Sequence, residues 1–231
     1  MSEQDLYPQL KSKKKVVVYV DGFNLYYGCL KDSKYRWLDL LKLSKLLLSD
    51  EYEIVKINYF TAHIIDHGTN GSTTRQGFYL NALKTIPNLE IKLGKFKKRE
   101  KTVYVNPPLK IINENPFGSD QRPLLKSILK GTSYEEKGTD VNLAVQLIID
   151  LYENNFDVAM VISNDSDYLS ALEKVRQKKK GLFIINTKLD QLPQHEMRRF
   201  SMGKKVLTEE KLKSAQFSEM VGNIRIPKEW E

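Results

Sequence analysis

A continuous run of β-branched and aromatic residues at 16–20 (Val-Val-Val-Tyr-Val) ends abruptly at Asp21 and Gly22. A strand with one face in water alternates apolar and polar side chains, so an unbroken apolar run predicts a strand that is buried on both faces. Strands of this kind occur in parallel sheets whose two faces are covered by helices. The run therefore favours an α/β architecture, and it places a carboxylate directly after a buried strand.

Strand-like and helix-like segments alternate along most of the remaining chain. The other segments that we predict to be strands are 53–62, 89–93, 157–163 and 181–186. The segments with a helical spacing of apolar residues are 36–48, 74–86, 141–152 and the stretch that begins near Tyr168. This alternation indicates βαβ units and a mostly parallel central sheet.

The length of 231 residues is sufficient for one large domain, and two small domains are not required. We expect a flexible tail at 1–14, a main domain at 15–190, and a helical extension at 191–231 that packs on the same domain. The regular pattern breaks between about 95 and 137, where prolines and glycines accumulate. Residues 97–105 fit a β-ribbon, and an insertion of this length is usually either functional or disordered.

The composition limits the environment and the partners of the chain. The formal net charge of +8 indicates a polyanionic partner, because basic surfaces attract phosphates at long range, although solubility alone would also explain it. No apolar run approaches the roughly 20 residues of a membrane span, and residues 1–15 lack the apolar core of a secretory signal. A single cysteine, Cys29, excludes an internal disulfide. We therefore expect a cytoplasmic protein with no membrane partner, and the sequence does not predict its oligomeric state.

Acidic side chains recur at the expected carboxyl ends of strands. Asp21 follows the first strand, and Asp165 and Asp167 follow the strand at 157–163. Asp140, at the N-cap position of a helix, faces the same crevice if the two strands are neighbours. Carboxylates that converge repel one another unless a cation lies among them, and all-oxygen ligation selects Mg²⁺ or Mn²⁺. Taken singly, each aspartate is more often a turn residue or a helix cap, so the prediction depends on their conjunction.

Three blocks of this sequence resemble the signature blocks of NYN domains, which belong to the PIN-like superfamily of nucleases. They are Val-Tyr-Val-Asp-Gly-Phe-Asn-Leu-Tyr-Tyr-Gly at 18–28, Lys-Gly-Thr-Asp-Val-Asn-Leu-Ala at 137–144 and Val-Ile-Ser-Asn-Asp-Ser-Asp at 161–167. The resemblance covers about residues 15–186, with a weaker similarity at the C-terminal Ile-Pro-x-x-Trp. It implies a three-layer, PIN-like α/β/α sandwich, a phosphodiesterase site that uses Mg²⁺ or Mn²⁺, and RNA as the usual substrate.

The resemblance also implies roles for individual residues. Asp21 and Asp140 match the first and second acids of the family, and Asp165 and Asp167 match the third and fourth. These four aspartates would bind the metal. Together with Asn24 they would form the catalytic set, in which Asn24 orients a metal-bound water or a neighbouring carboxylate.

One position departs from the family pattern. Some relatives carry a further acid in the helix after Asp140, where this chain has Gln146, so the number of bound metals stays open. Asp150 could substitute, but at the usual helical rise it lies about 15 Å along the helix from Asp140. We expect Asp150 to lie at the surface or behind the metal ligands.

Basic residues outside the acidic motifs are candidates for contacts with RNA. Arg75 opens a helix and could hold a phosphate with two hydrogen bonds. Lys95, Lys97, Lys98 and Arg99 surround an aromatic residue, as in proteins that bind single strands. Both features are also compatible with an ordinary solvated surface.

Other patterns argue against further cofactors. His63 and His67 have i,i+4 spacing, but they fall at an expected strand end and a glycine-containing turn, so no zinc site is predicted. The chain has no Walker loop and no GxGxxG motif, so no nucleotide cofactor is expected. Cys29 lacks a clear histidine partner and is interpreted as a buried thiol.

The sequence thus supports a metal-dependent endoribonuclease. Two alternatives stay open, namely a non-catalytic RNA-binding or regulatory module with the same fold and a DNA-directed nuclease of the same superfamily. The intact acidic set favours an enzyme. The sequence does not specify the RNA target or the cleavage position.

Overall fold

β1 (Lys14–Asp21) is the middle strand of a five-stranded sheet with the order β3-β2-β1-β6-β7. The structure is a computed structural model that describes residues 12–65, 71–111 and 124–230. All neighbouring strands of this sheet are parallel, as predicted. The other strands are β2 (Tyr52–Thr61), β3 (Leu89–Leu93), β6 (Val158–Ile162) and β7 (Gly181–Ile185).

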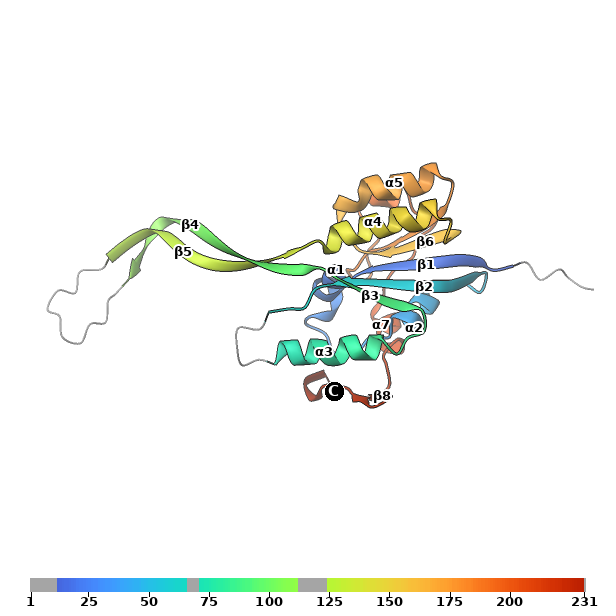
Figure 1. Cartoon of the computed structure of the whole chain (residues 1–231), viewed down its shortest axis with the longest axis horizontal. Helices are drawn as coiled ribbons and strands as arrows, with labels where there is room; N and C mark the ends of the chain where they lie inside the picture. The colour runs from blue at the N-terminus through green and yellow to red at the C-terminus, as the bar shows by residue number, and fades with distance from the viewer. Residues whose placement is uncertain (1–11, 66–70, 112–123, 231) are drawn as a thin grey trace, which may run out of the picture. The chain divides into compact units, whose positions relative to one another are not determined.

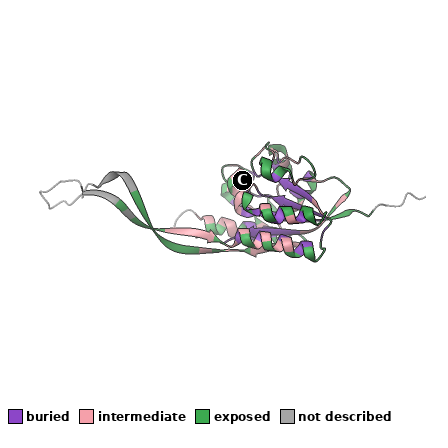
Figure 2. Ribbon diagram, turned by 90° about the horizontal axis from the view of Figure 1, so that it is seen from above, coloured by how far each residue is buried: buried purple, intermediate pink, exposed green. Residues whose placement is uncertain are grey.

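Helices cover both faces of this sheet (Figures 1 and 2). One face carries α2 (Leu40–Leu47), α3 (Ser72–Leu83) and α7 (Glu209–Ser214), and the other carries α4 (Thr139–Tyr152), α5 (Leu169–Gln177) and α6 (His195–Arg198). Val18 of β1 packs into the first core, and its neighbours Val17 and Tyr19 pack into the second. Two buried faces explain the unbroken apolar run and confirm the α/β/α sandwich. None of the described helices is long and apolar enough to cross a membrane.

The order of the strands creates a switch point at β1. The chain proceeds from β1 to β2 and β3 on one side, and it then returns to place β6 on the other side of β1. Open α/β sheets bind ligands at such a point, beyond the carboxyl ends of the strands. The parallel register pairs Val20 with Ile162, so the residues that follow them, Asp21 and Ser163, are neighbours. The fold thereby brings the first and third acidic blocks to one edge of the sheet.

Two short helical segments follow β1 without a loop, which apolar periodicity did not predict. They are α1 (Gly22–Leu25) and the π-helical turn η2 (Tyr26–Leu30). A Cβ atom at position 22 would lie 2.7 Å from the side chain of Tyr59, and one at Gly28 would lie 2.5 Å from the hydroxyl of Thr187. Both distances are far shorter than van der Waals contact. The two glycines therefore allow this segment to pack closely on the strand ends.

Two helices begin at residues other than those predicted, and their N-caps show why. The helix predicted from residue 36 begins at Leu40, because the Asp39 carboxylate accepts two backbone N–H groups of the first turn, at 2.9 and 3.0 Å. Asp140 was predicted as an N-cap but lies within the first turn of α4. The N-cap is Gly138, whose φ of 96° suits a residue without a Cβ atom.

Residues Phe96–Lys137 form a compact unit of their own, and the remaining residues form the other unit. Within the smaller unit, β4 (Lys95–Ile111) pairs with β5 (Leu124–Lys137) in a two-stranded ribbon. The sequence predicted part of β4 at 97–105 but did not predict β5. The insertion at 95–137 is therefore an ordered β-ribbon in its described parts, while residues 1–11 of the expected tail lie outside the described residues.

The C-terminal residues contain a hairpin as well as the predicted helices. After α7 come β8 (Met220–Val221), the antiparallel β9 (Ile224–Arg225) and the turn η4 (Lys228–Trp230). The centroid of the Trp230 ring lies 6.3 Å from the ring centroids of both Trp37 and Tyr79. This end of the chain thus packs on the first core, and Trp230 anchors it there.

Asp150 on α4 is buried, with 2% exposure, so of the two positions predicted for it, at the surface or behind the metal ligands, the surface position is wrong. The hydroxyl of Tyr19 donates to its Oδ2 at 2.7 Å, and the side-chain amides of Gln146 and Asn155 donate to its Oδ1 at 3.0 Å each. Burial, together with the adjacent Asp150 charge, raises the pKa of Tyr19 far above its usual range, so this hydroxyl remains a donor. Three donors offset the cost of burying the carboxylate and connect β1 to α4.

We predict that Tyr19→Phe lowers the free energy of unfolding by about 1–3 kcal/mol, because the variant leaves a buried carboxylate short of one donor. Chemical denaturation measures this change. The matched control is Tyr152→Phe, which removes the hydroxyl of a tyrosine that is 59% exposed and should change the stability by less than about 0.5 kcal/mol. Equal effects of the two substitutions would contradict a stabilising role for this network.

Candidate functional site

Asp21 ends β1 and is buried, with 3% exposure. Its Oδ1 accepts the backbone N–H of Asn24 at 2.9 Å, which makes Asp21 the N-cap of α1. Its Oδ2 accepts hydrogen bonds from the hydroxyls of Tyr168 (3.0 Å) and Ser163 (3.1 Å). A carboxylate at this depth therefore has three donors, and they come from both sides of the switch point.

The hydroxyl of Tyr168 joins Asp21 to Asp140. It lies 2.8 Å from Oδ1 of Asp140 as well as 3.0 Å from Asp21, although a phenol has one proton to donate. Two carboxylates thus converge on one hydroxyl. Burial raises the pKa of Asp21 above its usual range; the three hydrogen bonds oppose this rise and the charge of Asp140 adds to it. Burial and the two carboxylates raise the pKa of Tyr168 far above its usual range, so Tyr168 stays protonated.

Asp165 and Asp167 lie in the turn that presents Tyr168. Asp165 is the N-cap of η3 (Ser166–Tyr168), and its Oδ1 accepts the backbone N–H of Asp167 at 2.9 Å. The hydroxyl of Ser163 accepts the N–H of Asp165 at 3.1 Å while it donates to Asp21. Asp165 is half-buried and Asp167 is exposed. The capping role that the sequence left open for Asp165 is thus realised, and this cap orients the turn that carries Tyr168.

Asn24 connects three segments at the carboxyl edge of the sheet. Its backbone N–H donates to Asp21, and its side-chain oxygen accepts the N–H of Asn164 at 3.0 Å and the hydroxyl of Thr187 at 2.6 Å. The residue was predicted to orient a water or a neighbouring carboxylate. Its backbone contacts the carboxylate, and its side chain ties α1 to the segments that follow β6 and β7.

The donor set of Asp21 and Asp140 fits a hard cation. Both carboxylates lie within hydrogen-bond distance of one hydroxyl, and their repulsion would be relieved by a positive charge. Across residues 12–65, 71–111 and 124–230, no group of three or more His, Cys, Asp or Glu side chains is arranged to hold a metal ion. Asp165 and Asp167 therefore do not form such a group with the other two. Mg²⁺ commonly binds one or two carboxylates and completes its shell with water and substrate phosphates, so a two-carboxylate set is sufficient.

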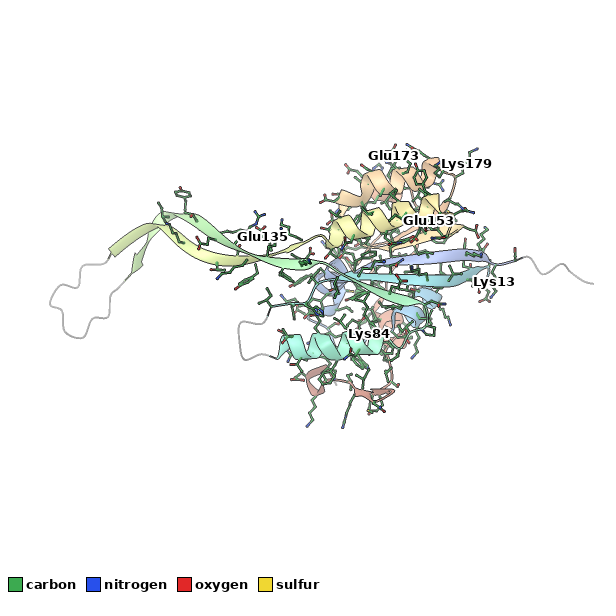
Figure 3. All side chains as sticks on the ribbon, viewed as in Figure 1. Lys13, Lys84, Glu135, Glu153, Glu173 and Lys179 are labelled. Carbon is green, nitrogen blue, oxygen red and sulfur yellow. The ribbon has the colours of Figure 1, made fainter. Side chains whose placement is uncertain are left out.

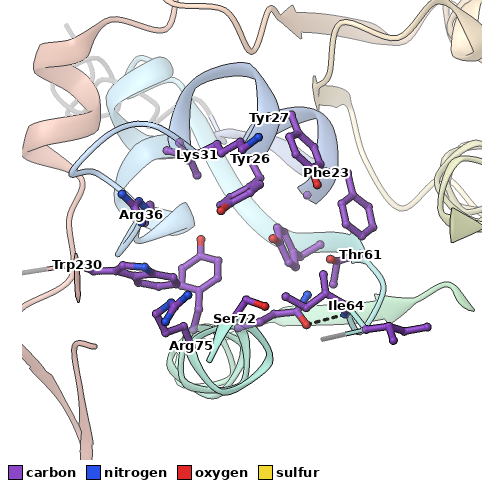
Figure 4. Close-up of a pocket in the computed structure, with 16 residues that line it drawn as sticks. Phe23, Tyr26, Tyr27, Lys31, Arg36, Thr61, Ile64, Ser72, Arg75 and Trp230 are labelled. Atoms are coloured by element: carbon purple, nitrogen blue, oxygen red, sulfur yellow. Dashed lines mark hydrogen bonds between the residues drawn. The ribbon is translucent and has the colours of Figure 1, made fainter. Parts of the chain in front are cut away.

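A pocket of about 320 Å³ is lined by the residues that follow Asp21 (Figure 4). Gly22 and Phe23 form part of its wall, and so does Arg75, one of the predicted phosphate contacts. Arg75 also makes an ion pair with Glu229, at 3.3 Å. Tyr59 is a further lining residue, and its pKa is raised by burial first and then by the charge of Asp21. The pocket is thus adjacent to the buried acid.

The predicted basic run lies on β4 in the ribbon. Lys95, Lys97, Lys98 and Arg99 are all exposed. Arg99 differs from the lysines because it forms an ion pair with Glu135 (labelled in Figure 3), at 3.4 Å. The pKa of Glu135 is lowered, most strongly by the hydrogen bond from Lys101. Lys97 and Lys98 have no carboxylate partner among the described residues, so they are the stronger candidates for a phosphate contact.

The remaining predicted features have no place in this site. His63 is exposed, and His67 lies outside the described residues. Cys29 is half-buried, its Sγ lies 3.5 Å from the carbonyl of Leu25, and burial raises its pKa to about 12. The thiol is therefore protonated at neutral pH and is a poor nucleophile.

Several residues that shape the site were not predicted. Tyr168 was assigned to the apolar stripe of a helix, because the spacing of apolar residues does not distinguish a core ring from a hydroxyl that contacts carboxylates. Ser163 and Thr187 directly follow buried strands, and this position at the carboxyl edge was the available signal for both. Trp230 lies in a C-terminal motif that matched only weakly, and it also lines the pocket.

The chain is similar to known proteins along most of its length. A family model described as the NYN domain matches residues 15–200. The chain is 33% identical over 178 residues to 6-hydroxy-3-succinoylpyridine 3-monooxygenase HspA of Pseudomonas putida, and the match covers 69% of this chain and 54% of that protein. The chain thus spans about half the length of that curated relative. A crystal structure of a protein of unknown function from Vibrio parahaemolyticus aligns with a TM-score of 0.48 and 18% identity, over 84% of this chain and 93% of that chain.

We predict that Asp21→Asn raises the melting temperature in EDTA at neutral pH. Because the pKa of Asp21 is raised in the folded protein, folding favours its protonated form. The contribution of protonated Asp21 to the free energy of unfolding is fully present when the pH lies below the usual carboxyl pKa of 3.8. This contribution is lost as the pH rises through the raised pKa of Asp21 in the folded protein. An asparagine can accept from Asn24 and donate to the two hydroxyls, and it carries no charge. The gain should be about 2–4 °C for each kcal/mol relieved.

Thermal melts of wild type and variant between neutral and acidic pH test this prediction. The difference between them should shrink as the pH falls, because wild-type Asp21 then becomes protonated. Asp50→Asn, at an exposed aspartate, is the matched control and should melt like wild type at every pH. A lower melting temperature for Asp21→Asn at neutral pH would show that the carboxylate stabilises the fold as a simple helix cap.

Proposed function

This chain belongs to the NYN domain family of the PIN-like nuclease superfamily, and from this premise and the geometry of the site we propose that it is a metal-dependent endoribonuclease. The observation that carries the proposal is the convergence of Asp21 and Asp140 on the hydroxyl of Tyr168, at the switch point of the sheet. Two carboxylates held this close without a counter-charge destabilise the fold. A cation that binds them offsets this cost and is available for chemistry.

Each residue of the site has a role in this proposal. Asp21 and Asp140 hold the Mg²⁺ or Mn²⁺. The hydroxyl of Tyr168, which contacts both carboxylates, keeps them close together. A bound ion of this kind activates water and neutralises the charge that develops on a phosphate. Asp167, exposed beside Asp165, positions the attacking water. Asn24 contributes indirectly, since it holds together the segments that carry the acids.

RNA contacts follow from the distribution of positive charge. The exposed lysines of β4 attract the phosphate backbone without reading sequence, and their contribution to affinity depends on salt. Arg75 lines the pocket that follows Asp21 and is a second candidate for a phosphate contact. The net charge of +8 adds a general attraction for a polyanion.

A second candidate function comes from the curated relative, which is named as a monooxygenase that acts on 6-hydroxy-3-succinoylpyridine. The observation that favours it is the 33% identity over 178 residues, together with an aromatic-lined pocket next to Asp21. A monooxygenase transfers one atom of O₂ to its substrate and reduces the other to water, so it requires a reductant. Oxygen uptake with this pyridine and a supplied reductant would support the second candidate, whereas its absence alongside RNA cleavage would support the first.

We predict that the purified protein cleaves single-stranded RNA in the presence of Mn²⁺ or Mg²⁺ and that EDTA abolishes cleavage. Asp21→Asn and Asp140→Asn should each reduce the cleavage rate about 100-fold or more, because each removes a charge that acts on the developing transition state. Asp50→Asn is the matched control and should retain the wild-type rate. Gel-resolved products of a labelled RNA, incubated beside a DNA of the same sequence, provide the measurement.

The outcomes of this assay separate the alternatives. Cleavage that persists in EDTA or in both aspartate variants would contradict the metal mechanism. Binding of RNA without cleavage under any metal would favour a non-catalytic RNA-binding module. Faster cleavage of the DNA would favour a DNA-directed nuclease.

Lys97 and Lys98 of the ribbon provide a test of the proposed RNA contacts. Replacing Lys97 and Lys98 with glutamate should weaken RNA binding and reduce the dependence of log Kd on log salt, because fewer counterions are released. The rate at saturating RNA should change little, since these contacts do not involve the reacting phosphate. The control is the double variant of Lys84 (labelled in Figure 3) and Lys213, two exposed lysines outside the ribbon, which changes the net charge equally. An equal loss of affinity in both variants would show that net charge alone attracts the RNA.

A further inference from the structure

The pocket that follows Asp21 has the character of a ligand site. It is formed by residues from α1 and η2, from the end of β2, from α3 and from the C-terminal turn. Its volume of about 320 Å³ lies near the lower end of the range for small-molecule sites, about 300–1,000 Å³. This size suits one ring system with a small substituent and is too small for several stacked bases.

Six of the sixteen residues that line the pocket are aromatic. The aromatic lining residues are Phe23, Tyr26, Tyr27, Tyr59, Tyr79 and Trp230. Neighbouring rings meet edge to face, with centroids 5.3 Å apart for Tyr26 and Tyr27 and 6.3 Å apart for Tyr59 and Tyr79. Tyr27 is 64% exposed, so its ring is accessible to a ligand. Aromatic walls of this kind bind planar rings by stacking, whatever the identity of the ring.

The charged groups of the lining are all positive. Lys31, Arg36 and Arg75 line the pocket, and no aspartate or glutamate is among its described lining residues. Arg36 donates from Nε to the carbonyl of Ser33 at 2.8 Å, and its terminal nitrogens have no partner in the described part of the chain. The Lys31 ammonium lies 5.4 Å from the centroid of the Tyr27 ring and has no carboxylate partner there. Since one of the three cations is paired with Glu229, the pocket retains an excess of positive charge that an anion would balance.

The two arginines lie together at one end of the pocket. In Figure 4, Arg36 and Arg75 lie toward one end of the pocket beside Trp230, and Phe23 lies toward the other. Phe23 is two residues from Asp21 in the chain, so the end away from the arginines is the one nearer the buried acid. A ligand whose anionic group reaches the arginines while its ring lies among the aromatic side chains matches this arrangement.

We propose that this pocket binds a planar aromatic ring that carries one anionic group. Its identity as one unstacked nucleotide of the RNA, with its phosphate among Lys31, Arg36 and Arg75, rests on the proposed function. A free small aromatic acid shares the same chemistry and is the other source of such a ligand. On the nucleotide assignment, the pocket holds the base next to the cleaved phosphate and so requires single-stranded RNA, since a base in a duplex cannot leave its stack without cost.

The test measures binding in EDTA and so does not depend on cleavage. Four probes are titrated against the full chain while its tryptophan fluorescence is followed: 5′-AMP, adenosine, inorganic phosphate and benzoate. We expect saturable quenching by 5′-AMP, with adenosine and phosphate each binding at least about tenfold more weakly, because each lacks one of the two recognised groups. The same fluorescence titration of Trp230→Phe, which retains only Trp37, shows whether the signal arises in the pocket.

Variants at exposed positions keep the fold intact. Tyr27→Ala and Lys31→Ala should each weaken 5′-AMP about tenfold, and Lys31→Ala should leave adenosine unchanged. The matched controls are Tyr152→Ala, at a ring that is 59% exposed, and Lys34→Ala, whose ammonium lies 5.6 Å from the centroid of the Tyr35 ring outside this pocket. Both controls should bind 5′-AMP like wild type.

Each outcome decides between the claims. Failure of both 5′-AMP and benzoate to bind, or equal binding by pocket variants and controls, would overturn the proposed site. Benzoate that binds more tightly than 5′-AMP would support the ring-and-anion chemistry and overturn the nucleotide assignment. Normal 5′-AMP binding by a protein that never cleaves RNA would support the pocket while the proposed nuclease function fails.

Discussion

The burial of one carboxylate, that of Asp21, is the constraint on which the rest of the site depends. A charged group with 3% exposure is tolerated when its oxygens have donors. Asn24, Ser163 and Tyr168 supply these donors from α1, from the end of β6 and from η3. Each donor belongs to a different segment, so satisfying Asp21 also fixes the positions of these segments. The hydrogen bonds that keep the Asp21 carboxylate buried are therefore the same contacts that fix the segments at the carboxyl edge of the sheet.

The same arrangement leaves one electrostatic conflict unresolved. The single proton of the Tyr168 hydroxyl faces two carboxylates, and the described part of the chain shows no second donor that contacts both. At Asp150, by contrast, each hydrogen bond has a proton of its own, because Tyr19 donates its single proton there and the side-chain amides of Gln146 and Asn155 supply the other two bonds. Local conflicts of this kind are typical of functional sites, where a ligand supplies what the fold omits. The contrast between the two buried aspartates explains why Asp21 is assigned to chemistry and Asp150 to structure.

The sequence predicted the sheet and the acidic motifs because both depend on local patterns. An unbroken apolar run requires two covered faces, and parallel strands place their following residues at one edge, which is why the acidic motifs at Asp21 and at 165–167 were expected at the same edge of the sheet. The pocket could not be predicted, because Phe23 and Trp230 are brought together only by the packing of the C-terminal turn on the first core. The described side chains of β5, the partner strand of the ribbon, are exposed or half-buried, so this strand lacks the buried apolar face by which the other strands were predicted. Asp150 was correctly placed far along α4 from Asp140, but helical rise alone does not show which face of the helix is buried.

The number of bound ions can be argued from the position where some relatives carry a further acid. Gln146 occupies that position, and its amide donates to Asp150 on the next turn of α4. Asp150 in turn uses its oxygens for Tyr19, Gln146 and Asn155, so neither residue is available as a ligand. On the proposed function, the Asp21–Asp140 pair favours a single ion, which these two carboxylates would hold and whose shell water and substrate phosphate would complete. Because the substrate would then supply part of the shell, binding of the ion and of RNA should be positively coupled, and linkage requires each to tighten the other by the same factor. A preassembled four-carboxylate site would bind its ions without substrate, so the strength of this coupling distinguishes the two designs.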